Sequence, residues 1–171
     1  MTDVAASVSR RWPLLAVIGS AIGLLDRVPY ALLALPLRVG AATVFWNSAM
    51  TKLANWDTTI ELFIDEYKVP LLPPELAANL ALSVELTTPV LLVLGLLTRA
   101  AALVLLGMTT VIEIFVYPQA WPTHIQWAAM LLVLLCRGAG KLSLDHVVWQ
   151  WVRRLGGVAA PAAKEDRINE I

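Results

Sequence analysis

Residues 75–97 read ELAANLALSVELTTPVLLVLGLL, and this stretch decides the fold class. A helix that crosses a bilayer needs about 20 mostly apolar residues. The segment has that length, and Glu85 is the one charged residue in its interior. Three further apolar runs cover residues 29–52, 99–117 and 122–137. We therefore predict an all-α integral membrane protein in which four spanning helices form a bundle.

The composition agrees with a membrane protein and excludes several other classes. Hydrophobic residues make up 58% of the chain and charged residues only 15%, whereas a soluble domain has roughly 25% charged residues. The formal net charge is zero, so nothing indicates binding to nucleic acid. The single cysteine, Cys136, excludes an internal disulfide. His124 and His146 are too few for a metal or haem site, so we expect no metal and no intrinsic cofactor.

The basic residues predict the orientation of the spans. With four spans and the N-terminus inside, the outer side holds Lys68, and Lys52 lies at the boundary. Apart from Arg38, which lies within the first span, the other basic residues then fall inside. By the positive-inside rule this distribution places both termini in the cytoplasm. These inner residues are Arg10, Arg11, Arg27, Arg99, Arg137, Lys141, Arg153, Arg154, Lys164 and Arg167.

The chain divides into three predicted parts. Residues 1–28 form a cytoplasmic N-terminus, 29–146 the four-span membrane domain, and 147–171 an interfacial helix with a cytoplasmic tail. The apolar segment 13–25 would reach about 20 Å as a helix, which is short of a bilayer core about 30 Å thick. We interpret it as an interfacial or re-entrant helix, with a signal peptide or a fifth span as alternatives. Residues 55–68 alternate at helical spacing and predict an amphipathic helix on the outer surface.

Glu85 is a carboxylate near the middle of the second predicted span. A charge at the bilayer centre costs roughly 2.5–3.5 kcal/mol on insertion scales, so such a residue is usually paired or functional. At 1.5 Å per residue, Glu85 lies about 15 Å below the outer start of its span, and Arg38 about 13 Å above the inner start of the first span. Because these depths nearly coincide, we predict an Arg38–Glu85 pair. Pro89 has no backbone N–H, so the backbone carbonyl of Glu85, four residues earlier, loses its helical hydrogen-bond donor.

A second polar set lies nearer the predicted outer face. Glu113 is near the outer end of the third span, His124 opens the fourth, and Lys52 ends the first. We predict a polar pocket that opens outward, with these three near its mouth and Arg38 and Glu85 at its floor. The candidates for proton transfer are Glu85, Glu113 and His124. The candidates for ligand binding are Arg38, Lys52, Trp127 and Asn47, although Asn47 falls on a different stripe of its helix.

Each of these residues also has a purely structural interpretation. The predicted Arg38–Glu85 pair would serve equally as a clamp between helices. Lys52 can extend its side chain toward the outer headgroups, and His124 can cap a helix at the interface. Tyr117 or His124 can satisfy Glu113 without any chemistry. The sequence leaves these alternatives open.

An ordered set of features resembles the DoxX family of small four-helix bacterial membrane proteins. The set runs over roughly 36–146, and one departure is Ala49, where the family usually has glycine. The matching features are Arg38, Lys52, Glu85, Gly95-Leu-Leu-Thr-Arg99, the Trp and His residues that open the fourth helix, and Gly138-Ala-Gly-Lys-Leu-Ser-Leu-Asp145.

The resemblance implies a protein of the bacterial inner membrane that is associated with redox chemistry. One hypothesis is a membrane subunit of an oxidoreductase whose pocket takes a quinone or a small anion, with electrons supplied by a partner. The other is a non-enzymatic anchor or assembly partner that docks another protein through residues 55–68 or the inner tail. A transporter is a third alternative and would require a homo-oligomer. Every alternative has the lipid bilayer as a partner, and the first two add a protein.

Overall fold

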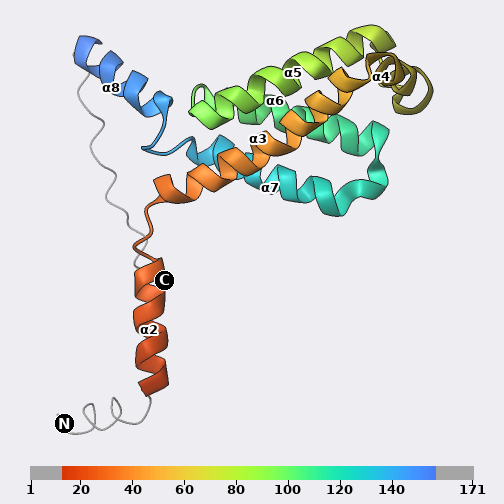
Figure 1. The fold of residues 1–171 in the computed structure, drawn as a ribbon. Helices are drawn as coiled ribbons and strands as arrows, with labels where there is room; N and C mark the ends of the chain where they lie inside the picture. The colour runs from red at the N-terminus through yellow and green to blue at the C-terminus, as the bar shows by residue number, and fades with distance from the viewer. Residues whose placement is uncertain (1–12, 157–171) are drawn as a thin grey trace, which may run out of the picture.

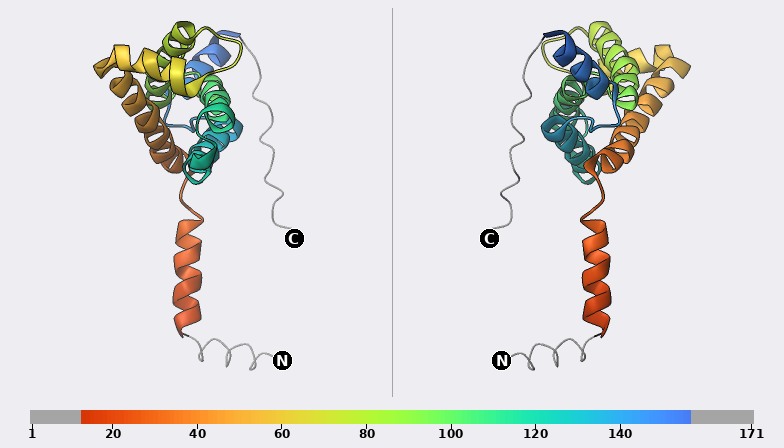
Figure 2. Two further views of the ribbon diagram at one scale, coloured as in Figure 1. Left: turned by 90° about the vertical axis from the view of Figure 1, so that its right-hand side faces the viewer. Right: turned by 90° about the vertical axis from the view of Figure 1, so that its left-hand side faces the viewer.

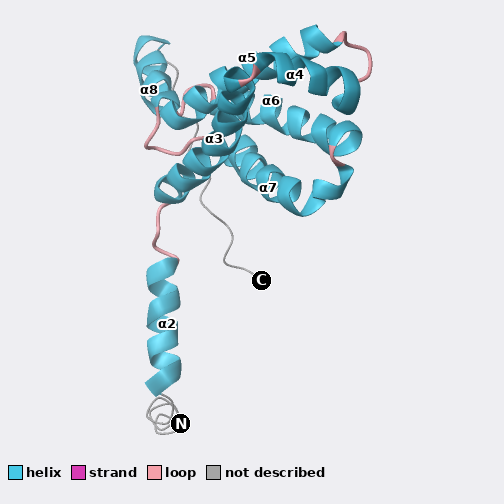
Figure 3. Cartoon of the chain, turned by 45° about the vertical axis from the view of Figure 1, so that its right-hand side comes forward, coloured by secondary structure: helices cyan, strands magenta, loops and turns pink. Residues whose placement is uncertain are grey.

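The computed structural model describes residues 13–156 of the 171-residue chain, and every regular element in this part is helical (Figure 3). The all-α prediction is confirmed for these residues. The outermost residues, 1–12 of the predicted N-terminal part and 157–171 of the predicted tail, lie outside the described residues.

Four helices pack against one another and share one apolar core (Figure 1). They are α3 (Tyr30–Ala54), α5 (Pro74–Leu94), α6 (Thr98–Val111) and α7 (Trp121–Arg137). The most extensive contacts are those of α3 with α5 and of α6 with α7. Small core residues such as Ala41 and Ala101 suit the close approach of helix backbones that is usual in a bilayer. The buried core consists of Ala41, Ala42, Phe45, Leu92, Ala101, Ala102, Leu105, Leu131 and Leu134.

The turn between α5 and α6 is short, and Asp145, from a later segment of the chain, stabilises it. Gly95 ends α5 in the left-handed conformation, with φ of 65°, and the Leu96 N–H donates to the Leu91 carbonyl at 2.9 Å, which is a common way to end a helix. The carboxylate of Asp145 accepts from the N–H groups of Leu97 at 2.7 Å and Thr98 at 3.0 Å. Asp145 thus caps the first turn of α6.

Short helices close one end of this four-helix core. They are α4 (Trp56–Leu62), the π-helix η1 (Phe63–Tyr67), the π-helix η2 (Ile112–Val116) and the 3₁₀-helix η3 (Pro118–Ala120). Phe63 packs with Ala77 and Ala78 of α5 in a second, smaller core. Most of the amphipathic segment predicted over 55–68 is therefore helical, and it contacts the N-terminal half of α5.

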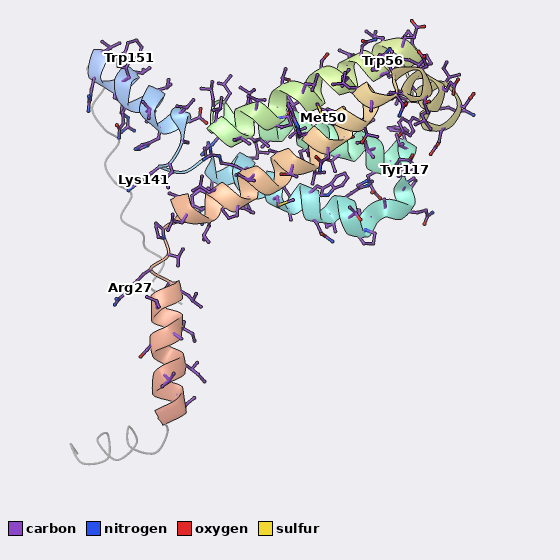
Figure 4. All side chains as sticks on the ribbon, in the orientation of Figure 1. Arg27, Met50, Trp56, Tyr117, Lys141 and Trp151 are labelled. Atoms are coloured by element: carbon purple, nitrogen blue, oxygen red, sulfur yellow. The ribbon has the colours of Figure 1, made fainter. Side chains whose placement is uncertain are left out.

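Two helices lie at the edges of this core. Helix α2 (Pro13–Leu25) projects away from it (Figures 1 and 2), and its part Val17–Leu25 is bent by 68° from α3. Helix α8 (Leu144–Gly156) follows α7 at the end away from α4, as the labels of Trp151 and Trp56 show in Figure 4. Its exposed apolar residues include Val147, Val148, Trp149 and Trp151.

Length and composition identify two helices that could cross a membrane, Pro74–Leu94 and Thr98–Val116. The bent pair Val17–Leu25 and Tyr30–Ala54 becomes a third if it forms one span. Helix α7 has 17 residues and is shorter than these two. The four-span count and the placement of the termini therefore stay predictions.

Gly95 is a position where a side chain should be costly. A Cβ built there would lie 2.6 Å from Ser143 Cβ and 2.8 Å from Arg38 Nη2, and φ of 65° is unfavourable for alanine. We expect Gly95→Ala to lower the free energy of unfolding by more than about 1 kcal/mol. Thermal unfolding of the detergent-purified protein measures this.

Gly107→Ala is the matched control, because a Cβ on Gly107 of α6 would meet no heavy atom within 4 Å. We expect its melting temperature to equal or exceed that of the wild type. Equal melting temperatures for the two variants would contradict the close packing described at Gly95.

Candidate functional site

A cavity of about 460 Å³ lies among α3, α5, α6 and α7, at the end that η1 and η2 cover. Most of its lining is apolar, including Val84, Met108 and Trp127. Its polar lining residues are Ser48, Lys52, Tyr67, Glu85, Tyr117 and His124. A largely apolar pocket with a few convergent polar groups is typical of a binding site for a small molecule.

The first polar group in the wall is an ion pair between Lys52 and Glu85. Lys52 Nζ lies 2.9 Å from Oε1 and 2.8 Å from Oε2 of Glu85. The Ser48 hydroxyl donates to Glu85 Oε1 at 3.0 Å and accepts from Lys52 Nζ at 2.8 Å. The Glu85 side chain is only 2% exposed and that of Lys52 14%. The carboxylate therefore has three hydrogen-bond contacts in an apolar surround, which offset the cost of its burial.

The second polar group is a histidine–carboxylate pair. His124 Nδ1 lies 2.5 Å from Glu113 Oε2, and the His124 side chain is 5% exposed. The His124 ring is 4.9 Å from the Trp127 ring, which in turn meets Phe45 edge-on at 5.8 Å. Nδ1 is committed to Glu113, so Nε2, which has no hydrogen-bond partner among the described residues, is the ring atom free to bind a ligand.

Aromatic residues link the short helices that cover the cavity. Tyr67 of η1 and Tyr117, just after η2, have ring centroids 5.6 Å apart, and the Tyr117 hydroxyl donates to Glu66 Oε1 at 2.7 Å. Burial raises the pKa of Tyr117, and the hydrogen bond to Glu66 raises it further. Tyr117 therefore remains a protonated donor at neutral pH and holds η1 against η2.

Arg38 corrects the sequence prediction, because it does not pair with Glu85. Its guanidinium donates to backbone carbonyls: Nε to Leu92 at 2.7 Å, Nη2 to Val93, and Nη1 to Leu142 at 2.8 Å. Within the described residues it has no contact with a carboxylate short enough for an ion pair. Arg38 is 2% exposed and does not line the cavity. It joins the end of α5 to the segment that precedes α8, which is a structural role.

The error arose from the depth assigned to α3. Glu85 lies opposite Ser48 and Lys52, and Arg38 reaches the level of Leu92. Ser48 is ten residues beyond Arg38, which corresponds to about 15 Å along a helix. The first turns of α3 thus extend past the end of α5. The depth of Arg38 was measured from the start of α3, and this reference placed Arg38 too close to the level of Glu85.

The structure separates the other predicted residues into two groups. Glu113, His124, Lys52, Glu85 and Trp127 lie at or against the cavity. Asn47 is exposed on α3 and does not line it, as its different stripe implies. No group of three or more His, Cys, Asp or Glu residues suited to a metal occurs within residues 13–156.

Sequence reasoning missed part of the site. Ser48 was not singled out, although it lies one turn before Lys52 on the same face of α3. Tyr67 was assigned to an amphipathic surface helix and not to a cavity wall. Its helical spacing with Phe63 marked an apolar face, but the sequence did not show what covered that face.

A helical membrane protein with a polar-edged cavity between its helices is the class that this fold and site define. The family model of DoxX matches residues 33–118, and the chain belongs to the DoxX family. An uncharacterized protein of Haemophilus influenzae is 31% identical over 124 residues, which cover 66% of this chain and 80% of that protein. No solved structure matches the chain.

The Lys52–Glu85 pair leads to a test by double-mutant cycle. Lys52→Met leaves a buried carboxylate without its cation, and we expect a loss of about 3–5 kcal/mol in unfolding free energy. Combining Lys52→Met with Glu85→Gln should recover most of that loss, because no unpaired charge remains. Unfolding in detergent of the wild type, both single variants and the double variant measures the coupling.

The matching cycle of Arg38→Met with Glu85→Gln is the control. The two residues share no partner in the structure, so their effects should add to within about 0.5 kcal/mol. A coupling in the second cycle as large as in the first would restore the Arg38–Glu85 pair and overturn the correction.

Proposed function

We propose that this protein is a membrane subunit or accessory of a redox system, and that its cavity binds the head of a quinone. The observation that carries the proposal is an apolar cavity of about 460 Å³ whose walls hold the Lys52–Glu85 pair and His124, with Glu113 behind the histidine ring. A quinone head is a flat apolar ring with two polar oxygens, and a bound quinone supplies two-electron, two-proton chemistry.

Lateral access favours a ligand that arrives through lipid. Leu80 of α5 and Val104 and Val111 of α6 all line the cavity and are 48%, 47% and 38% exposed. The short turn 95–97 joins α5 to α6 at the opposite end of these helices from Leu80 and Val111. An isoprenoid chain would pass between the two helices at this point, with the head beside Trp127.

His124 is the residue best placed to move a proton. Neutral imidazole presents Nε2 as an acceptor for a quinol hydroxyl, and imidazolium presents it as a donor to a quinone carbonyl. Glu113 stabilises the imidazolium through Nδ1 and is itself 19% exposed. His124 and Glu113 would therefore form a short route for protons between the cavity and its outside.

Lys52 and Glu85 favour a quinone over a small anion. The positive charge of Lys52 is matched by Glu85 at 2.8 Å, so the pair presents no net charge to a ligand. An anion would have to compete with a buried carboxylate for the same ammonium group. Glu85 keeps its proposed role in proton transfer as a carboxylate at the cavity wall, and the electrons would come from a partner protein.

We extend the proposal to topology and place. All four core helices would cross the bacterial inner membrane, with both termini in the cytoplasm and the cavity toward the outer face. Support comes from the 17 residues of α7, which reach about 26 Å, and from Arg99, Arg137 and Lys141 at the end opposite the cavity. Basic residues are enriched on the cytoplasmic side of membrane proteins.

The alternative function is a non-enzymatic anchor. It is supported by α8, whose exposed Trp149 and Trp151 offer an apolar surface outside the four-helix core. The segment 55–68 supports it less, because Phe63 and Tyr67 are used as walls of the cavity.

Filling the cavity tests the quinone proposal. Ala81 lines the cavity and is half-buried, so Ala81→Phe places a ring in the space proposed for the ligand. Overpacking of this kind weakens binding by roughly tenfold or more. Mass spectrometry of lipid extracts from the purified protein measures retained quinone, and quenching of Trp127 fluorescence by a short-chain quinone measures affinity, with Trp127→Phe as the blank.

Val90→Phe is the matched control, because Val90 is on the same helix, 46% exposed, and does not line the cavity. It should retain quinone as the wild type does. Equal quinone content in both Phe variants, or none in the wild type, would contradict the proposal. The anchor would be favoured if the wild type holds no quinone and substitution of Trp149 and Trp151 abolishes the protein's function.

A further inference from the structure

A second hollow, of about 810 Å³, lies at the end of the core opposite the cavity. It is bounded by the start of α6, the end of α7, the segment 138–143 and the first turns of α8. Figure 4 shows Lys141 at this end, with Tyr117 of the cavity far from it. The proposed redox function uses none of these residues.

Cationic side chains from three different segments line this hollow. They are Arg99 of α6, Arg137 of α7 and Lys141 of the connecting segment, and His146 of α8 joins them. Arg99 donates to the Cys136 carbonyl at 3.2 Å, and Arg137 lies over the Tyr30 ring at 4.7 Å. Among the described residues none of these cations has a carboxylate partner within ion-pair distance.

The one carboxylate in the lining is already engaged. Asp145 accepts the N–H groups of Leu97 at 2.7 Å and Thr98 at 3.0 Å, so its oxygens are turned toward α6. The lining therefore carries three permanent positive charges and one negative charge, that of Asp145, which leaves a net charge of +2. The hydroxyl of Thr98, also in the lining, is buried and has no hydrogen-bond partner in the described part of the chain.

The rim of the hollow is apolar on the α8 side. Val148 and Trp149 line it and are 48% and 53% exposed. Tryptophan is enriched where a protein meets the headgroup region of a bilayer, and arginine and lysine are the usual ligands of phosphate groups. The hollow thus combines cations for a phosphate with an exposed apolar edge.

We infer that this hollow binds a phosphate-bearing anion between Arg99, Arg137 and Lys141. Anionic lipid headgroups and free phosphate share this chemistry. The apolar rim supports the lipid, and the experiment below distinguishes the two sources. The inference is independent of the quinone proposal, because it concerns the other end of the molecule.

The test is native mass spectrometry of the full-length, detergent-purified protein with added phosphatidylglycerol or phosphatidylcholine. The wild type should retain one phosphatidylglycerol in preference to phosphatidylcholine. Arg99→Gln combined with Lys141→Gln should weaken this binding roughly thirtyfold. The double variant Arg153→Gln/Arg154→Gln is the matched control, because it removes the same charge from α8 outside the hollow.

A parallel titration with inorganic phosphate identifies the source. Phosphate that displaces the lipid, or binds alone and only when Arg99 and Lys141 are present, would assign the site to a soluble phosphate. Equal weakening in both double variants, or no binding of lipid or phosphate to the wild type, would overturn the inference. Lys141→Gln alone guards against misfolding, since Lys141 is exposed, and it should still weaken binding severalfold.

Discussion

Two cations on α3, the buried Arg38 and the largely enclosed Lys52, position α5 against α3. In an apolar surround each buried charge must find a partner, because an unpaired one costs several kcal/mol. Arg38 meets this need with the carbonyls of Leu92, Val93 and Leu142, and Lys52 with the carboxylate of Glu85. α5 is thus attached to α3 at two levels, which fixes its register along the helix.

The two attachments differ in what they leave accessible. Arg38 is enclosed by backbone, so a ligand has no route to its guanidinium, and its place beside Gly95 tolerates little change. Lys52 and Glu85 are also paired, but one side of the pair faces a cavity. Both cations are paired because they are largely enclosed. Arg38 therefore serves only the structure, whereas the Lys52–Glu85 pair can also contact a ligand in the cavity. His124 and Glu113 add a titratable pair to the accessible end only.

Sequence patterns predicted the helical class, the membrane class and the family, because apolar length and ordered motifs are local properties. Glu85, Lys52, Glu113 and His124 were marked as exceptional for the same reason. The sequence also offered His124 as a partner of Glu113, and the structure contains that pair. The partner of Glu85 depends on how far α3 is shifted along α5, which no local pattern records. The depth argument failed for Arg38 because α3 extends beyond the end of α5, and long side chains of arginine and lysine reach partners one or two turns away.

The π-helices show how the accessible end is kept open. η1 and η2 both line the cavity, and both widen the helix relative to an α-helix. π-Helices are rare in proteins, but those that occur are often found at functional sites. Straight α-helical continuation of α4 or α6 would turn Tyr67 and Tyr117 to other faces. Their ring contact at 5.6 Å, and the bond of Tyr117 to Glu66, hold both segments in this form. The cavity therefore depends on local helix geometry as much as on the charges in its walls.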